Sequence, residues 1–267
     1  MGTGITFIGG GNMATALIGG LVASGTDPRT IQVVEPFAPQ RERLWADHGV
    51  FATPVADSAT ARASLVVWAV KPQAFAQAAA AGGPGLTDAL HLSVMAGVRS
   101  DTLARATGSD RVVRAMPNTP ALIGQGIAGL FAREAVSAGD RALVETVLRP
   151  TGETLWVAAE ADLDAVTALS GSGPAYVLYL LEAMMAAGAS MGLPPGQARA
   201  LALATVSGTA EMARRSAEPP QVLRAQVTSK GGTTAAAIET LDLRAVKDTF
   251  IEAMRNAQRR AVELGAG

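Results

Sequence analysis

The sequence of 267 residues contains no cysteine and only two histidines, His48 and His91. The absence of cysteine excludes disulfide bonds, thiolate nucleophiles and zinc sites with cysteine ligands, and no metal is expected. Neither histidine lies in a motif. A chain of this length allows one large domain or two ordinary ones with a substantial buried core.

The sequence also lacks an excess of charge of either sign and a long hydrophobic run. With 22 basic and 23 acidic residues, no global field would attract nucleic acid or an anionic membrane, so a small-molecule partner is expected. The first apolar run, ITFI, is too short for a secretory signal. The most apolar span, residues 173–192, carries Glu182 near its middle and is rich in Ala and Gly, which argues against a membrane helix. We expect a cytoplasmic protein.

The first half alternates short apolar runs with helical patterns, which is typical of a βαβ succession. Several runs show no polar alternation, as expected for strands of a parallel sheet that is covered on both faces. Strands are predicted at residues 5–8, 31–34, 65–70, 90–95, 112–116, 127–131 and 155–157, and helices at 12–23, 39–48, 72–81 and 100–106.

From Asp162 onward the pattern is helical, which predicts one domain over residues 1–157 and an all-helical domain over 158–267. Between Tyr176 and Met191 the only charge is Glu182, so this helix is apolar nearly all round and needs cover on every side. We expect the helical domain to wrap around its copy in a homodimer. The alternative is a simple central helix of a bundle.

The segment Gly9-Gly10-Gly11-Asn12-Met13-Ala14 matches the dinucleotide fingerprint G-x-G-x-x-A and stands between a predicted strand and a predicted helix. Gly9 permits a tight turn, Gly11 lets the backbone approach a pyrophosphate, and Ala14 lets the helix approach the sheet. The pattern predicts a Rossmann-like, doubly wound α/β domain whose helix N-terminus holds the phosphates. A glycine-rich turn without a ligand is the alternative.

Glu35 follows the second strand, where an acidic side chain accepts hydrogen bonds from the adenosine ribose and favours NAD. Arg41 and Arg43 follow closely and could supply the charge that NADP needs, or form a solvated helix face. The sequence therefore leaves the choice between NAD and NADP open.

Three further segments follow predicted strands, at the edge where doubly wound sheets bind ligands. They are Ala69-Val70-Lys71-Pro72, Met95-Ala96-Gly97 and Met116-Pro117-Asn118-Thr119-Pro120. We expect all three to face the cofactor, although Lys71 could also be an exposed loop lysine.

The helical half contains two turns of small residues, Ser170-Gly171-Ser172-Gly173 and Ser229-Lys230-Gly231-Gly232-Thr233-Thr234. The first could simply cap the helix that follows. In the second, glycine N–H groups at a helix start, hydroxyl donors and Lys230 suit a carboxylate or a phosphate, although a plain N-cap is the alternative. A protonated imine needs only a modest hydrogen-bond donor for hydride transfer, and the Thr234 hydroxyl would suffice.

The stretches GITFIGGGNMATALIGGL, WAVKP, RAMPNTPAL, LSGSGPAY and TSKGGTT, in this order, closely resemble the pyrroline-5-carboxylate reductase family. The resemblance implies reduction of 1-pyrroline-5-carboxylate to L-proline by NADPH or NADH, the last step of proline biosynthesis. It also implies a helical domain that forms dimers and often decamers, with active sites that combine the cofactor domain of one chain with helices of its partner.

The resemblance further implies roles for individual residues. The pyrophosphate would be held by Gly9, Gly11, Asn12 and Met13, the adenosine ribose would lie at Glu35 and Pro36, and the cofactor cleft would be lined by Ala69, Val70, Lys71, Pro72 and Ala96. The substrate would be bound by Ser229, Lys230, Gly231, Gly232, Thr233 and Thr234, with Thr234 as donor to the imine nitrogen and Glu160 as an acidic residue near the ligand.

Two positions depart from the usual family pattern. Lys230 replaces a proline, which adds a charge near the substrate carboxylate. Glu35 stands where NADPH-using relatives often carry a small polar residue. Two other functions remain open: a β-hydroxyacid dehydrogenase, although residues 175–182 lack the expected lysine, and a non-catalytic NAD(P)-binding sensor.

Overall fold

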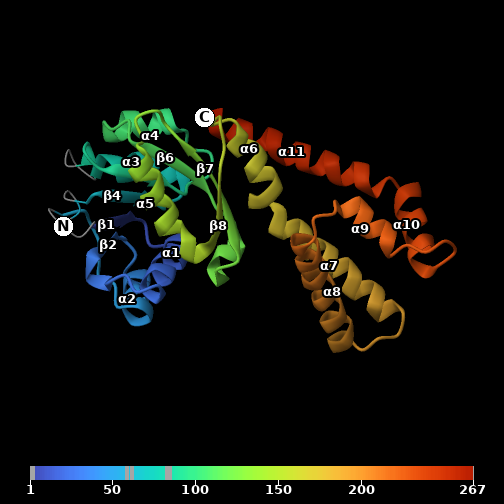
Figure 1. The fold of residues 1–267 in the computed structure, drawn as a ribbon. Helices are drawn as coiled ribbons and strands as arrows, with labels where there is room; N and C mark the ends of the chain where they lie inside the picture. Colours follow the sequence, from blue (N-terminus) through green and yellow to red (C-terminus); the bar gives the residue numbers. More distant parts are fainter. Residues whose placement is uncertain (1–3, 58–59, 61–62, 82–85, 267) are drawn as a thin grey trace. The chain divides into compact units, whose positions relative to one another are not determined.

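The computed structural model describes residues 4–57, 60, 63–81 and 86–266, which form two compact units. The first unit comprises the chain up to Ser172 together with the segment from Ala257 onward, and the second comprises Gly173–Asn256 (Figure 1). The predicted division of functions between residues 1–157 and 158–267 stays a prediction.

Within the described residues, the first unit contains one eight-stranded sheet in the order β3-β2-β1-β4-β5-β6-β7-β8. The strand order reverses at β1, which makes the ends of β1 and β4 a switch point where doubly wound sheets bind ligands. The predicted α/β class is thereby confirmed. The strands are β1 Ile5–Ile8, β2 Ile31–Val34, β3 Ala52–Thr53, β4 Leu65–Trp68, β5 Leu90–Ser93, β6 Val112–Met116, β7 Gly126–Ala132 and β8 Gly152–Trp156.

One strand departs from the parallel arrangement, since β7 pairs antiparallel with β6 and all other pairings are parallel among the described strands. The connection from β6 to β7 contains only the short 3₁₀ helix η5, Thr119–Ile123. A parallel neighbour needs a crossover of a dozen or more residues, usually a helix, so the short connection reverses the strand.

Helices cover both faces of the sheet, as the uninterrupted apolar strands predicted. In β4, Leu65 and Val67 belong to a core completed by α1, α2 and α5, whereas Val66 and Trp68 belong to a core completed by α3 and α4. The helices of the first unit are α1 Asn12–Ala23, α2 Ala38–His48, α3 Phe75–Ala81, α4 Ser100–Thr107, α5 Ala138–Leu148 and α6 Asp162–Val166.

Several element boundaries differ from the sequence prediction. The strands predicted at 65–70 and 90–95 end at Trp68 and Ser93, because the residues that follow leave the ladder to form loops. The last strand, β8, covers Gly152–Trp156 and not 155–157. The short edge strand β3 and helix α5 were not predicted, although Ser137 and Asp140 form a capping box at the start of α5.

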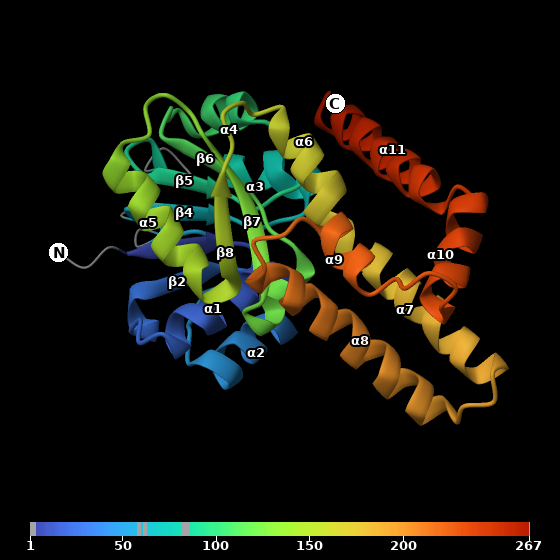
Figure 2. The ribbon, with the colours of Figure 1, turned by 45° about the vertical axis from the view of Figure 1, so that its right-hand side comes forward.

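The second unit is helical and contains α7 Gly173–Ser190, α8 Pro195–Arg215, α9 Pro220–Gln226, α10 Thr233–Leu243 and the first half of α11 Val246–Ala266 (Figure 2). Helices α7 and α8 lie side by side, and Gly188 allows close approach, since a Cβ there would lie 2.9 Å from that of Ala198. Much of α7 stays exposed, including Leu178 and Tyr179, which is 71% exposed. The apolar helix predicted to need further cover is therefore largely uncovered by its own chain. No helix in the described part of the chain is both long and apolar enough to cross a membrane.

Candidate functional site

The glycine loop between β1 and α1 lies at the switch point of the sheet. Gly9 has a φ of +98°, and a Cβ at this position would lie 2.7 Å from the carbonyl oxygen of Ala69, so only glycine fits without strain. The Gly9 N–H donates to the carbonyl oxygen of Val34 at 2.9 Å. The loop is therefore fixed between the carboxyl ends of β2 and β4.

The N-terminus of α1 suits a phosphate. Gly11 is the N-cap residue, no side chain of the described residues caps the helix, and its first turn holds no acidic residue. A Cβ built on Gly11 would meet nothing within 4 Å, and Gly11 lines the cavity described below, so the start of α1 is open on this side. Unpaired N–H groups and the positive end of the helix dipole favour a phosphate at this place.

A cavity of about 550 Å³ opens beside this loop. Its lining includes many of the predicted cofactor residues, namely Gly9, Gly11, Glu35, Pro36, Ala69, Val70 and Lys71. The other predicted residues are not part of this lining: Asn12 and Met13 form the first turn of α1, Pro72 begins the 3₁₀ helix η3 Pro72–Ala74, and Ala96 is exposed after β5.

Sequence reasoning missed part of the cavity wall, which consists of Pro54, Val55 and Ala56 after β3, and of Gln77 and Ala78 on α3. The only available sequence signal was the predicted helix 72–81, which reaches this edge of the sheet. A glycine cradle, an uncapped helix N-terminus and a largely apolar cavity together fit a dinucleotide.

The Glu35 carboxylate lies at one side of the cavity and accepts two backbone hydrogen bonds. Gly10 N–H donates to Oε2 and Phe37 N–H donates to Oε1, both at 2.8 Å. The Arg41 side chain binds the backbone next to this carboxylate: its Nη1 donates to the carbonyl oxygens of Glu35 at 2.9 Å and Pro36 at 2.7 Å. Glu35 thus braces the glycine loop and presents a negative charge there.

The segment Ser229–Thr234 lies in the second unit and forms the turn that starts α10. Gly231 has a φ of +74°, Gly232 is the N-cap residue, and its N–H donates to the carbonyl oxygen of Ser229 at 3.1 Å. No side chain of the described residues caps α10. Thr233 begins the helix as predicted, Lys230 is exposed and Thr234 is half-buried. The turn is thus an N-cap with a loop, as the plain alternative has it, and its first N–H groups carry no side-chain cap and could accept an anion, so the predicted anion site stays a prediction.

Known protein families and relatives match nearly the whole chain. A model of the pyrroline-5-carboxylate reductase dimerisation domain matches residues 160–264, and a model described as NADP oxidoreductase, coenzyme F420-dependent, matches residues 4–97. A pyrroline-5-carboxylate reductase of Pseudomonas aeruginosa is 43% identical over 97% of this chain and 96% of its own. The chain belongs to the pyrroline-5-carboxylate reductase family.

Solved structures of the family agree with this fold. The pyrroline-5-carboxylate reductase of Coxiella burnetii superposes with a TM-score of 0.92 at 37% identity, covering 98% of both chains. The Plasmodium falciparum enzyme, whose structure has NADP bound, superposes with a TM-score of 0.87 at 27% identity, covering 98% of this chain and 97% of its own. The match to the family's dimerisation domain includes the exposed helix α7, which supports the predicted homo-oligomer.

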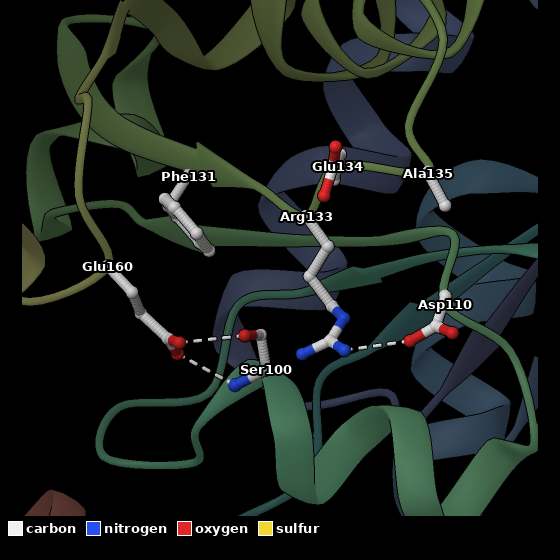
Figure 3. A pocket seen from close by; sticks show the side chains of 7 residues that line it. All are labelled: Ser100, Asp110, Phe131, Arg133, Glu134, Ala135 and Glu160. Atoms are coloured by element: carbon white, nitrogen blue, oxygen red, sulfur yellow. Dashed lines mark hydrogen bonds and ion pairs between the residues drawn. The ribbon is translucent and has the colours of Figure 1, made fainter.

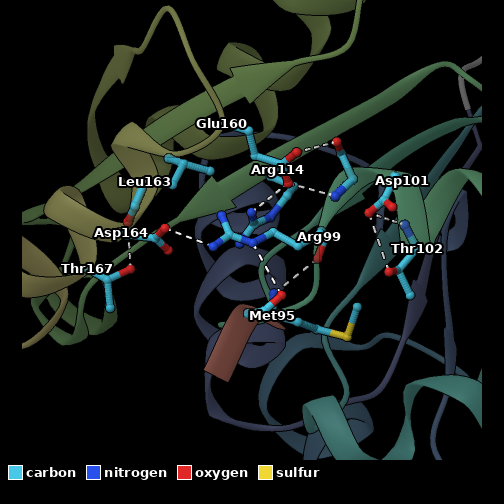
Figure 4. Close-up of polar contacts among 12 residues, drawn as sticks. Met95, Arg99, Asp101, Thr102, Arg114, Glu160, Leu163, Asp164 and Thr167 are labelled. Atoms are coloured by element: carbon cyan, nitrogen blue, oxygen red, sulfur yellow. Dashed lines mark hydrogen bonds and ion pairs between the residues drawn. The ribbon is translucent and has the colours of Figure 1, made fainter. Parts of the chain in front are cut away.

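Glu160, predicted near the ligand, lies in the first unit, where its carboxylate is already bound (Figure 4). Oε1 accepts from Ser100 N–H and from Arg114 Nη1, and Oε2 accepts from the Ser100 hydroxyl, all at 2.7 Å. Burial raises the pKa of Glu160, but these hydrogen bonds and the Arg114 charge outweigh it and hold the pKa below its ordinary value. Glu160 therefore caps α4 and neutralises a buried arginine, and its contact with substrate stays a prediction.

A second hollow of about 550 Å³ lies beside Glu160 and is lined by Ser100, Asp110, Phe131, Arg133, Glu134, Ala135 and Glu160 (Figure 3). Its charged groups are largely engaged with each other, since Arg133 Nη2 lies 2.7 Å from Asp110 Oδ1 and Glu160 is held by Ser100. Within the described residues, no cluster of three His, Asp or Glu side chains could hold a metal ion.

The remaining motifs hold the fold together. The side-chain oxygen of Asn118 accepts from Ile127 N–H at 3.0 Å and so fixes the start of β7. The segment Thr167–Gly171 forms a π-helical turn between α6 and α7. The turn at Ser170-Gly171 is therefore part of a continuous helical segment and not only a cap of the helix that follows. A Cβ at Gly171 would lie 2.6 Å from the Met116 side chain, so glycine here lets this turn approach the end of β6.

Proposed function

We propose that this protein reduces 1-pyrroline-5-carboxylate to L-proline with hydride from a reduced nicotinamide cofactor, the last step of proline biosynthesis. The observation that carries the proposal is a glycine cradle with an adjoining cavity in a chain that matches the family over nearly its whole length.

The cofactor supplies the hydride, and the chain's first unit supplies its binding site. Helix α1 offers N–H groups and a favourable dipole to the pyrophosphate. In this proposal the pyrophosphate is held by Gly9, Gly11, Asn12 and Met13, the ribose by Glu35 and Pro36, and the remaining cleft by Ala69, Val70, Lys71, Pro72 and Ala96.

The start of α10 binds the substrate carboxylate in this proposal. Its donors are the backbone and hydroxyl groups of Ser229, Gly231, Gly232 and Thr233, with Lys230 as counter-charge. The Thr234 hydroxyl donates a hydrogen bond to the ring nitrogen and orients the C=N bond. The carbon of that bond accepts the hydride, and the nitrogen takes a proton from solvent through this hydroxyl, which gives the amine of L-proline and the oxidised cofactor. Because that amine is strongly basic, no strong protein acid is required. Glu160 contributes indirectly by fixing α4.

The functional assembly is a homo-oligomer in this proposal, with residues 158–267 as the dimerisation and substrate-binding domain and 1–157 as the dinucleotide-binding domain. A dimer is the minimal unit, a decamer is a further possibility of the same family, and the protein works in the cytoplasm. The exposed apolar residues of α7 support the dimer, because a surface of this kind is normally covered in a stable oligomer.

A direct assay tests the function. Purified protein is mixed with NADH or NADPH and 1-pyrroline-5-carboxylate, and loss of the reduced nicotinamide absorbance is followed together with L-proline formation. We expect turnover with this imine, none with 3-keto acids and the reduced cofactor, and none with 3-hydroxyacids and the oxidised cofactor. Turnover of the latter would indicate a β-hydroxyacid dehydrogenase, and cofactor binding without any turnover would indicate a sensor.

A further inference from the structure

One carboxylate is held in a fixed position at the edge of the dinucleotide cavity. Glu35 Oε2 accepts from Gly10 N–H in the glycine loop, and Oε1 accepts from Phe37 N–H just before α2, both at 2.8 Å. The side chain is therefore anchored at both oxygens and lines the cavity. Its negative charge cannot turn away without breaking these two charge-assisted hydrogen bonds.

The same carboxylate keeps acceptor capacity. Two carboxylate oxygens offer about four lone-pair positions, and two are used by the backbone donors, so each oxygen can accept another hydrogen bond. The unmodified adenosine ribose of NADH offers two hydroxyl donors. The 2′-phosphate of NADPH is instead negatively charged and can only accept hydrogen bonds at neutral pH or above. The nearby N–H donors of Gly10 and Phe37 are already bound to Glu35 and are not available to it.

The positively charged side chains near Glu35 do not neutralise the negative charge of its carboxylate. Arg41 lines a separate hollow with Trp45 and Phe51, and its Nη1 is engaged by two backbone carbonyls. Arg43 is exposed on α2. Lys71 is the positively charged residue among the described residues that line the cavity, and a single lysine against a fixed carboxylate leaves no excess positive charge for a phosphate dianion.

We infer that Glu35 makes this protein selective for NADH over NADPH, by accepting the ribose hydroxyls and repelling a 2′-phosphate. The inference rests on the proposed function for the class of cofactor, and it resolves the choice that the sequence left open between Glu35 and the two arginines.

Binding to the unmodified protein is the first test, measured by calorimetry without substrate. NADH is compared with NADPH, and ADP-ribose is compared with 2′-phospho-ADP-ribose, which isolates the ribose from the nicotinamide. We expect both unphosphorylated ligands to bind at least about tenfold more tightly, a difference of about 1.4 kcal/mol. Equal affinities, or tighter binding of the phosphorylated forms, would overturn the inference.

Two variants identify the residue responsible. Glu35→Gln removes the charge with little change of shape, and Glu35→Ser removes the whole carboxylate. Both should shift the NADPH-to-NADH affinity ratio by roughly tenfold toward NADPH, the size expected for losing one like-charge contact. Glu42→Gln, an exposed residue on α2, is the matched control and should leave the ratio unchanged.

The outcomes separate this inference from the proposed function. An unchanged ratio in folded Glu35 variants would contradict the role of Glu35, whereas failure to reduce the imine with either cofactor would contradict only the function. Circular dichroism reports whether each variant is folded. If both Glu35 variants fail to fold, the ligand comparison on the unmodified protein still decides the selectivity.

Discussion

Two glycines of the same loop, two positions apart, should respond to the same substitution in opposite ways. Gly9→Ala places a Cβ 2.7 Å from the Ala69 carbonyl oxygen at a φ of +98°. Backbone strain of about 1–3 kcal/mol adds to a similar cost for the steric overlap, so we expect a loss of about 3 kcal/mol in unfolding free energy. For a protein of this size the melting temperature should fall by roughly 6–12 °C.

Gly11→Ala should leave stability nearly intact, because Gly11 has an ordinary φ of −67° and its Cβ would meet nothing within 4 Å. The cost is at most about 1 kcal/mol, from the weaker N-cap preference of alanine. The added methyl group instead enters the space in front of the α1 N-terminus. We expect the affinity for NADH to fall by roughly tenfold or more.

Thermal unfolding without nucleotide and calorimetric titration with NADH measure the two effects separately. The reasoning is refuted if Gly9→Ala melts within about 2 °C of the unmodified protein, where the structure demands several degrees. It is refuted equally if Gly11→Ala binds NADH as tightly as the unmodified protein does, since the open space at this N-terminus would then not be the phosphate site.

Four further predictions concern pH, stability, chemistry and assembly. Burial, the largest cause, lowers the pKa of His91 to about 4. Up to about 3 kcal/mol of unfolding free energy that is present above pH 6.5 should therefore be lost as the pH falls toward 4. Denaturant unfolding measures this loss, and the variant His91→Gln, which cannot titrate, should show a correspondingly smaller dependence of unfolding free energy on pH. Glu160→Ala leaves the guanidinium of Arg114, 5% exposed, without its ion pair and should lower the unfolding free energy by roughly 2–3 kcal/mol, and an unchanged value would mean that the pair is dispensable. Thr234→Ala should lower kcat strongly while NADH affinity stays the same, and unchanged turnover would remove this hydroxyl from the mechanism. Mixing subunits of Thr234→Ala with subunits of Gly11→Glu should restore roughly a quarter of the sites if active sites combine two chains, and no recovery after subunit exchange would refute that arrangement.

The pH prediction depends on the hydrogen bonds of a single buried ring. His91 Nδ1 accepts from Trp68 Nε1–H at 3.0 Å, and Nε2 lies 2.9 Å from the Leu86 carbonyl oxygen, which can only accept. The ring is therefore neutral with its proton on Nε2. A second proton on Nδ1 would face the indole donor, so protonation breaks this contact as well as burying a charge.

Local patterns in the sequence predicted most of the fold. The apolar run of β4 lacks polar alternation because both faces of the sheet are covered, and Gly9 marks a turn that only glycine forms without strain. Thr233 opens α10 where the pattern indicated. In each case the feature is determined by a few residues that are neighbours in the sequence, so a local sequence pattern is enough to predict it.

The features that escaped prediction depend on contacts between distant residues. The antiparallel direction of β7 follows from the length of its connection, and the wall at Pro54–Ala56 follows a strand of only two residues. Glu160 and Arg114 pair across 46 positions, so neither side of that ion pair is visible in a local pattern. The two hydrogen bonds from Gly10 N–H and Phe37 N–H to the Glu35 carboxylate likewise become visible only in the three-dimensional structure.

The first unit is discontinuous in sequence, because the segment from Ala257 onward belongs to it. Within that segment Gly265 accepts a hydrogen bond from Arg99 Nε at 3.4 Å, and the Leu264 carbonyl oxygen would lie 3.2 Å from a Cβ at Gly97. During synthesis the first unit can therefore close only after the segment from Ala257 onward has left the ribosome, and the helical unit emerges before that segment.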